Sequence, residues 1–258
     1  MRVARFALED ADPRYGIVDE DAIAVLKGHP LLHGYETTGE RVALDDARLL
    51  APIIPSKVVC VGMNYAEHRE DMNFANQNPD RPLFFLKPST AVVGPGDPIR
   101  IPPVPGRIVH ESELAIVIGR VAKQVRREDW RDHVFGFTIA NDVSARDEMF
   151  ADGQWARAKG FDTFCPLGPW IETELDPLAG LEVQSYVDGE PRRHGNTANM
   201  IFDVPTILEF ASDIWTLLPG DVIITGTPSG LGGFTAGQRV DIDIEGIGRL
   251  SNPALPRD

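Results

Sequence analysis

The sequence predicts an α+β protein that is mainly β. Apolar stretches of strand length recur along the chain, separated by Gly- and Pro-rich breakers such as Gly94–Pro98 and Pro102–Gly106. Few helices are indicated, and strands do not alternate with long helices, which disfavours a doubly wound or barrel α/β fold. We therefore expect a mixed β architecture with a few short packed helices.

Residues 1–52 are predicted to form a small N-terminal β-rich domain, and residues 57–258 a larger one. Pro52 and Pro55 lie in the segment Leu49–Pro55, which has the composition of a linker between the two. The strands expected in the small domain are Val3–Phe6, Gly16–Val18 and Ala22–Leu26.

The larger domain carries six further predicted strands, one hairpin turn and one clear helix. Asp188-Gly189 is a typical two-residue hairpin turn. Asp203 can cap a helix that ends before Pro219-Gly220. The side chains expected on the core face of this helix are Ile207, Phe210, Ala211 and Ile214. The predicted strands are Val58–Val61, Leu83–Leu86, Glu113–Ile118, Phe135–Ala140, Leu181–Val187 and Val222–Thr225.

Composition narrows the functional classes. The formal net charge of −14 argues against nucleic acid as a partner, because binding to phosphates needs a basic face. No apolar stretch approaches the roughly 20 residues of a membrane span, and the start is too quickly acidic for a secretory signal. We therefore expect a cytoplasmic protein without membrane contact. Cys60 and Cys165 lie in apolar settings and are expected to be reduced thiols, with a catalytic thiol as the weaker alternative.

Three carboxylates indicate a metal site. Glu111 and Glu113 are two residues apart at the start of a predicted buried strand, so both would leave the same face. Two unpaired buried carboxylates would be costly, and Asp142, at the end of another strand, offers a third oxygen ligand. An all-oxygen set suits Mg²⁺ or Mn²⁺. The alternatives are a pair of glutamates facing water at a strand edge and an Asp142 that caps a helix.

His68 is the candidate general base. Asn64 and Glu67 have the spacing of a capping box, which would place His68 in the first turn of a helix, where the helix dipole favours the neutral ring. Asp71, three residues on, shares its helix face and could orient it. The alternative interpretation is a solvated helix start with mixed charges.

Two further segments carry groups that could bind an anion. Lys159 lies among aromatic and small residues, where it could be partly desolvated, although most lysines lie at the surface. Gly226-Thr227 follows a strand in a Gly-rich loop that lacks a nucleotide-binding signature, and its backbone N–H groups could hold an oxygen.

In this order, the segments resemble the fumarylacetoacetate hydrolase family. The resemblance covers residues 57 to about 250 and includes bacterial members of the acylpyruvase or 2-hydroxyhepta-2,4-diene-1,7-dioate isomerase type. Residues 1–52 resemble the small N-terminal appendage of some bacterial members. The matching segments are Val61–Tyr65 with His68, Phe85–Ser89, His110–Leu114, Asn141–Asp147, Ala158–Asp162 and Thr225–Pro228.

The resemblance implies a β-roll or β-sandwich that binds Mg²⁺ or Mn²⁺, in a homodimer. It implies that the metal ligands are Glu111, Glu113 and Asp142. Its catalytic residues would be His68 as base, Asp71 as its partner and Lys159 as the cation that stabilises an oxyanion. Substrate contacts are expected from Tyr65, Lys87, Arg146, Gly226 and Thr227. Two departures stand out: Asp71 replaces a glutamate, and Met149 replaces a glutamine that often contacts substrate.

The resemblance also implies a small anionic 2-oxo acid as substrate. The leading hypothesis is a metal-dependent hydrolase that cleaves a carbon–carbon bond in 2,4-dioxo acids of the acylpyruvate or fumarylpyruvate type, through a metal-bound enolate. The alternatives are a decarboxylase or isomerase of unsaturated 2-oxo diacids in aromatic catabolism, or an oxaloacetate decarboxylase. A catalytically silent metal-binding scaffold is the non-enzymatic alternative.

Overall fold

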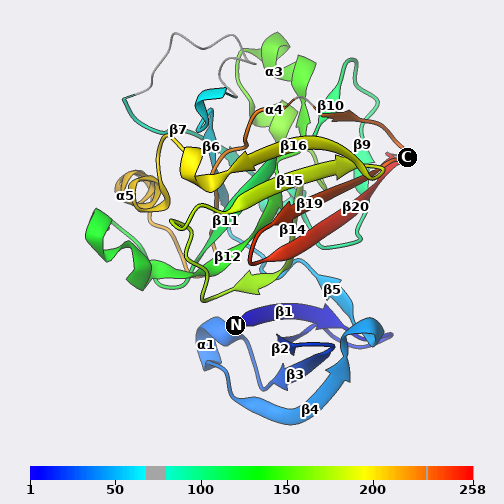
Figure 1. Ribbon diagram of the computed structural model, residues 1–258, viewed down its shortest axis with the longest axis vertical. Helices are drawn as coiled ribbons and strands as arrows, with labels where there is room; N and C mark the ends of the chain where they lie inside the picture. The colour runs from blue at the N-terminus through cyan, green and yellow to red at the C-terminus, as the bar shows by residue number, and fades with distance from the viewer. Residues whose placement is uncertain (68–79, 231, 258) are drawn as a thin grey trace.

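The computed structural model describes residues 1–67, 80–230 and 232–257, and it consists mainly of β-sheet with short helices at the edges (Figure 1). The predicted mainly β, α+β class is confirmed. All the predicted strands are present, although several are longer than the sequence indicated.

A small unit of five strands stands at one end of the molecule, drawn in blue in Figure 1. It has its own apolar core, which includes Phe6 and Ile23. Strand β1 also pairs with β14 of the larger part through Arg2 and Val3, so one sheet continues through both. The elements of this unit are β1 (Arg2–Ala7), β2 (Arg14–Asp19), β3 (Ala22–Leu26), α1 (Pro30–His33), β4 (Thr37–Ala43), η1 (Leu44–Asp46) and β5 (Arg48–Leu50).

The expected linker Leu49–Pro55 is partly structured. Leu49 and Leu50 belong to β5, which pairs with β1, and Ile53 packs in the core below the large sheet. Burial of these apolar side chains stabilises the folded chain, which explains why the segment packs against its neighbours and does not extend into solvent. The division of the chain into domains at residues 52 and 57 stays a prediction.

The large sheet positions the site. Its order is β4-β3-β2-β1-β14-β12-β11-β17-β6-β7, and every residue of the inner strand β11 is buried. Alternate residues of β11 face two different apolar cores, with Leu114 and Ile116 on one face and Ala115 and Val117 on the other. Beyond the small unit, its strands are β6 (Val58–Gly62), β7 (Leu83–Lys87), β8 (Val92–Val93), β11 (Ser112–Ile118), β12 (Val134–Asn141), β14 (Cys165–Glu172) and β17 (Val222–Ile224).

A five-stranded sheet of order β16-β15-β19-β20-β9 covers the first of these cores. The predicted hairpin joins β15 to β16, and both turn residues, Asp188 and Gly189, have positive φ, as a type I′ turn requires. The strands are β9 (Ile99–Ile101), β15 (Glu182–Val187), β16 (Glu190–Asn196), β19 (Arg239–Ile244) and β20 (Gly248–Pro256).

A third, small sheet and the remaining helices complete the fold. The strands of this sheet are β10 (Ile108–Val109), β13 (Ser144–Ala145) and β18 (Gly233–Phe234). The helices are η2 (Ser89–Ala91), η3 (Arg127–His133), α3 (Arg146–Asp152), α4 (Ala156–Lys159), η4 (Thr197–Asn199) and α5 (Val204–Ile214).

The core face of α5 differs from the prediction. Asp203 caps the helix as expected, accepting a hydrogen bond from the Thr206 N–H at 3.0 Å. However, Phe210 and Ile214 are 36% and 54% exposed. The buried stripe begins one turn earlier and follows the spacing i, i+3, i+4, i+7 of one helix face. It consists of Val204, Ile207, Leu208 and Ala211.

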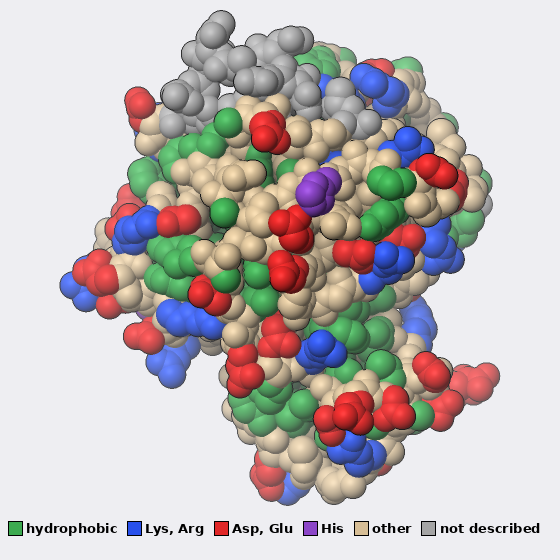
Figure 2. Space-filling view, viewed as in Figure 1, with side chains coloured by type: hydrophobic (Ala, Val, Ile, Leu, Met, Phe, Trp, Pro, Cys, Tyr) green, Lys and Arg blue, Asp and Glu red, His purple; other side chains and the backbone are tan. Residues whose placement is uncertain are grey.

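Both cysteines are buried free thiols, as the sequence predicts. Burial raises the pKa of the Cys60 thiol and raises that of Cys165 to about 12, which keeps both protonated and unreactive at neutral pH. In the part of the chain that the structure describes, no helix is long and apolar enough to cross a membrane. On the face shown in Figure 2, acidic side chains are interspersed with Lys and Arg.

Candidate active site

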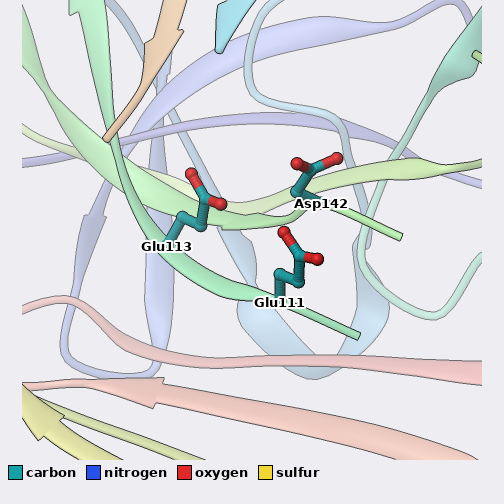
Figure 3. A group of neighbouring side chains, drawn as sticks. All are labelled: Glu111, Glu113 and Asp142. Atoms are coloured by element: carbon teal, nitrogen blue, oxygen red, sulfur yellow. The ribbon is translucent and has the colours of Figure 1, made fainter. Parts of the chain in front are cut away.

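Three carboxylates converge where β11 begins and β12 ends (Figure 3). Ser112 pairs with Asn141, and the Asp142 N–H donates to the Glu111 carbonyl at 2.9 Å, which places the two chain segments side by side. Oxygens of Glu111, Glu113 and Asp142 all lie within 4.8 Å of one another, and all three side chains are buried. The i, i+2 spacing thus brings both glutamates to the same spot, as the sequence predicts.

Two buried lysines contact this cluster. Lys159, at the end of α4, donates to Glu111 Oε2 at 2.7 Å and to Asp142 Oδ2 at 2.5 Å. Lys87 Nζ, at the end of β7, lies 2.8 Å from Asp142 Oδ1, at an ion-pair distance but without hydrogen-bond geometry. Burial opposes the charged form of Lys159, but attraction to Asp142 and Glu111 prevails and raises its pKa.

Lys87 was expected to contact substrate, but its ammonium is enclosed by protein oxygens. It donates to the carbonyls of Val143 at 3.0 Å, Phe164 at 2.8 Å and Lys159. An ammonium has three N–H bonds, so these contacts use its donors. The geometry makes Lys87 a support for Asp142 and for the end of α4 instead.

The charges of the site favour a divalent cation. Three carboxylates outnumber the two ammonium groups by one, in a buried region. Burial, and after it the negative charges of Asp142 and Glu111, raise the pKa of Glu113 well above its usual value, so a cation beside the cluster would favour the ionised form of this carboxyl. The donor set consists of carboxylate oxygens, which suits a hard ion such as Mg²⁺ or Mn²⁺.

The Gly-rich loop after β17 contacts the cluster from one side. The Gly226 N–H donates to Glu113 Oε2 at 2.6 Å. This donor therefore orients a carboxylate, whereas the sequence predicted that it would contact a substrate oxygen. The Thr227 hydroxyl lines the cavity above the carboxylates and accepts from the Ser112 N–H at 3.1 Å. Gly226 has φ +95°, and a Cβ there would lie 2.7 Å from Asn64 Cβ and 3.2 Å from the Val61 carbonyl oxygen, so the loop approaches the end of β6 closely.

The Asn64 side chain connects the start of the site to two other segments. Its amide donates to the carbonyls of Thr225 at 2.8 Å and Phe202 at 3.0 Å, and accepts from the Phe202 N–H at 2.8 Å. The described residues show no capping-box bond between Asn64 and Glu67, so that prediction is wrong. Asn64 instead satisfies buried backbone groups that no sequence spacing reveals.

An apolar wall completes the cavity; of its residues, the sequence pointed to Met149 as a departure from the family pattern, and it gave Phe85 and Trp155 no role. It consists of Phe85, Met149 and Trp155, with the β6 end at Val61–Met63 beside them. Phe85 and Trp155 pack edge to face at a ring separation of 5.2 Å, and the Lys159 ammonium lies 5.0 Å from the centre of the Phe85 ring. Phe85 begins the matching segment Phe85–Ser89, whereas Trp155 lies only a few residues before the matching segment Ala158–Asp162.

Besides Lys87 and Gly226, two further predicted substrate contacts are absent from the described lining of this cavity. Tyr65 is buried, and burial together with the nearby charge of Glu113 raises its pKa. Arg146 is also buried, and its guanidinium lies 5.9 Å from the centre of the Phe150 ring. His68 and Asp71 lie outside the described residues, so their catalytic roles stay predictions.

Comparison with solved structures identifies close relatives of the whole fold. A 5-carboxymethyl-2-hydroxymuconate delta-isomerase from Mycobacterium smegmatis superposes with a TM-score of 0.92 and 44% identity, over 100% of both chains. A maleylpyruvate hydrolase from Sphingobium sp. SYK-6, in complex with manganese(II) ion and pyruvate, has a TM-score of 0.82 and 34% identity, also over 100% of both chains.

Sequence comparison gives a consistent result. Protein Rv2993c of Mycobacterium tuberculosis is 48% identical over 99% of this chain and 98% of its own length. Oxaloacetate tautomerase YisK of Bacillus subtilis is 40% identical over 81% of this chain and 74% of its own length. Residues 1–52 match the family model Rv2993c-like, N-terminal, and residues 57–254 match the model fumarylacetoacetate (FAA) hydrolase C-terminal. The related proteins above include a hydrolase, an isomerase and a tautomerase, and the chain therefore belongs to the fumarylacetoacetate hydrolase family.

Proposed function

We propose that this protein is a divalent-metal-dependent hydrolase that cleaves a carbon–carbon bond in 2,4-dioxo acids of the acylpyruvate or fumarylpyruvate type. The observation that carries this proposal is the position of Lys159, whose ammonium lies within a buried triad of carboxylates. A purely structural metal site has no need of an ammonium between its ligands. An enzyme that must stabilise a developing oxyanion does.

The site residues bind and orient the reactants. Glu111, Glu113 and Asp142 would hold Mg²⁺ or Mn²⁺, which when bound supplies Lewis acidity toward the substrate's carboxylate and 2-oxo oxygens. A divalent charge would turn the excess of one negative charge into an excess of one positive charge, and this favours an anionic 2-oxo acid. Lys87 and the Gly226 N–H keep Asp142 and Glu113 in place, since each contacts a carboxylate oxygen.

The hydrolysis itself balances with one water molecule. His68, oriented by Asp71, takes a proton from water, whose oxygen attacks the carbonyl at C4. The bond between C3 and C4 then breaks, and its electron pair remains on the pyruvate fragment as an enolate. Two N–H bonds of Lys159 point to carboxylates, and the third can donate to the oxygen on which negative charge develops. Protonation at C3 gives pyruvate, and the other product is a carboxylic acid.

Keto–enol tautomerisation of a 2-oxo acid is the second candidate. It is supported by relatives named oxaloacetate tautomerase, which are 44% identical in Xenopus laevis and 40% in Bacillus subtilis. The reaction requires the same enolate and one proton transfer, but no attacking water. Decarboxylation of oxaloacetate, or isomerisation of an unsaturated 2-oxo diacid in aromatic catabolism, also shares this enolate. A silent metal-binding scaffold would bind the ion without turnover.

The experiment is a substrate panel assayed with Mg²⁺, with Mn²⁺ and with chelator. Acylpyruvates, fumarylpyruvate, oxaloacetate and unsaturated 2-oxo diacids are each followed for pyruvate release, for carbon dioxide release and for loss of enol absorbance. Pyruvate release from acylpyruvates supports the hydrolase. Loss of enol absorbance without either product identifies a tautomerase. A protein that binds the metal but acts on no 2-oxo acid would be the scaffold.

The assembly and location belong to the same proposal. We expect a homodimer, as the family resemblance implies, and light scattering behind gel filtration measures its mass. We also expect the protein to act in the cytoplasm, because its proposed substrates are small metabolic acids. Neither statement affects the chemistry proposed for the carboxylate site.

A further inference from the structure

The helix α4, which carries Lys159 as its last residue, is too short to be stable alone. It has four residues, and the Lys159 N–H donates to the Trp155 carbonyl at 2.9 Å to close its single turn. An isolated turn of this kind is unstable in water, because helix nucleation costs more than one hydrogen bond returns. Contacts with neighbouring elements therefore fix the place of Lys159 in the carboxylate cluster.

Two contacts anchor the ends of α4. At its start, Trp155 packs over Gly62, where a Cβ would lie 2.6 Å from Trp155 Cζ3, so the indole occupies space that only glycine leaves. At its end, the Lys87 ammonium donates to the Lys159 carbonyl. The middle of the helix is held by a third contact, which comes from α3.

The Arg157 guanidinium makes this third contact. Its Nε donates to Asp152 Oδ2 at 2.8 Å and its Nη2 to Asp152 Oδ1 at 2.6 Å, the paired geometry in which a guanidinium binds a carboxylate most strongly. The same Nη2 contacts Glu148 Oε2. Glu148 and Asp152 share a face of α3, because they are one helical turn apart. One cation thus joins two carboxylates of the neighbouring helix, and we call this contact the Arg157 bridge.

The buried carboxylate of Glu148 gives the bridge its strength. The pair with Asp152 alone would contribute little, since the Arg157 side chain is 47% exposed. The Glu148 side chain, however, is only 7% exposed, and Arg157 is the one charged group that contacts it in the part of the chain that the structure describes. A buried carboxylate without a partner is costly, so Glu148 favours the arrangement in which α4 lies against α3.

The bridge connects the same two chain segments that meet inside the cluster. Helix α3 begins at Arg146, shortly after the predicted metal ligand Asp142, and α4 ends at Lys159. Inside the cluster, Lys159 donates to Asp142 Oδ2 at 2.5 Å. Arg157 does not belong to the described lining of the cavity, so it holds these segments together from outside.

We propose that Arg157 is a positioning residue, which holds α4 against α3 and so keeps the Lys159 ammonium within the carboxylate cluster. The placement of Lys159 is independent of any reaction, whereas the effect of Arg157 on turnover rests on the proposed function.

Acylation of lysines tests the placement of Lys159 without substrate or metal. The protein receives a short pulse of an amine-acylating reagent under native conditions, and peptide mass spectrometry gives the rate at each lysine. In the wild type, the buried Lys159 and Lys87 should react far more slowly than the exposed Lys123. In Arg157→Met, Lys159 should react at least about fivefold faster, because α4 opens more often. Lys87 belongs to β7, and its rate should not change.

Two further variants separate the bridge from other effects. Arg126→Met removes an exposed arginine that pairs with two acidic residues of η3, so it is the matched control and should leave the Lys159 rate unchanged. Glu148→Gln combined with Arg157→Met removes the carboxylate that would otherwise be left without a partner, which favours a folded variant. Lys159 should still react faster in this double variant than in the wild type.

Turnover supplies a second measurement. On an acylpyruvate, Arg157→Met should lower kcat by about 10- to 100-fold and change KM by less than about threefold, because misplaced Lys159 affects the developing oxyanion more than the metal-held end of the substrate. Arg157→Lys keeps the charge but not the paired hydrogen bonds, and should recover part of kcat.

The outcomes distinguish this inference from the proposed function. An unchanged Lys159 rate in Arg157→Met overturns the inference, and so does a parallel rise at Lys87 in both variants, which would indicate general unfolding. The inference also fails if the double variant shields Lys159 as the wild type does, since the unpaired Glu148 would then be the cause. If the wild type acts on no 2-oxo acid but Lys159 responds as expected, the proposed function fails and the positioning role of Arg157 stands.

Discussion

Replacing Lys159 by methionine removes one charge from the carboxylate cluster and keeps most of the side-chain volume. In the metal-free protein, Glu111 and Asp142 then lose the ammonium that contacts them at 2.7 and 2.5 Å. Removing one partner of a buried ion pair costs about 3–5 kcal/mol of folding free energy. For a chain of this size, that should lower the melting temperature by roughly 10 °C. The remaining negative charge should also strengthen metal binding, because only Lys87 still offsets the three carboxylates.

The substitution should therefore lower the stability of the metal-free protein and raise its affinity for the metal. Calorimetry should show a less stable metal-free variant that binds Mg²⁺ more tightly and gains more stability from it than the wild type. The turnover number on the best substrate should fall by about 100- to 1,000-fold, the usual effect of losing an oxyanion donor. Lys123→Met, which removes an exposed lysine bonded to the Asp213 carbonyl, is the matched control. A Lys159→Met variant with wild-type turnover, or with weaker metal binding, would refute this reasoning.

Three other substitutions test separate parts of the structure. His68→Ala should spare metal binding but reduce hydrolysis far more than decarboxylation, as initial rates would show; equal losses would remove the case for a water-activating base. Gly62→Ala should displace Trp155 and cost about 1–3 kcal/mol by overpacking, and an unchanged denaturant midpoint would count against the wall geometry. The Asp221 carboxylate accepts hydrogen bonds from Ser56 Oγ at 2.6 Å and from the Leu218 N–H at 2.7 Å. Burial raises the pKa of Asp221, but the hydrogen bonds from Lys57, Ser56 and Leu218 outweigh burial and lower it. The ionised Asp221 therefore stabilises the fold above pH 3.8, its ordinary pKa, and this stabilisation is lost as pH falls through the lower pKa of the folded state. The difference in free energy of unfolding between the wild type and Asp221→Asn should therefore shrink below pH 3.8.

The carboxylate cluster was predictable because it depends on local geometry. Residues i and i+2 of a strand share a face, so Glu111 and Glu113 could be assigned to one spot before any contact was known. Asp142 could be added because a buried glutamate pair needs a cation, and this carboxylate lies just after the next predicted strand, Phe135–Ala140. The apolar pattern likewise indicated which residues form strands, since burial on both faces requires continuous apolar runs.

Other features depend on contacts between distant segments, which a sequence pattern does not encode. The carbonyls that enclose Lys87 come from Val143, Lys159 and Phe164, so its supporting role appears only after folding. The pairing of β1 with β14 extends one sheet across both parts of the chain, although each strand pattern alone is compatible with separate sheets. In α5, Phe210 and Ile214 fit an apolar stripe as well as Val204 does, and only packing decides between the overlapping faces.

The central claim is that Glu111, Glu113 and Asp142 hold a divalent ion required for turnover of a 2-oxo acid. Its most direct test is the hydrolysis rate of an acylpyruvate, followed by loss of its enol absorbance and by pyruvate release, with metal-depleted protein before and after addition of Mg²⁺ or Mn²⁺. We expect no turnover without metal, recovery on addition of either ion, and neither metal binding nor recovery in Glu113→Gln. Activity that survives complete metal removal, or that returns fully in Glu113→Gln, would contradict the claim.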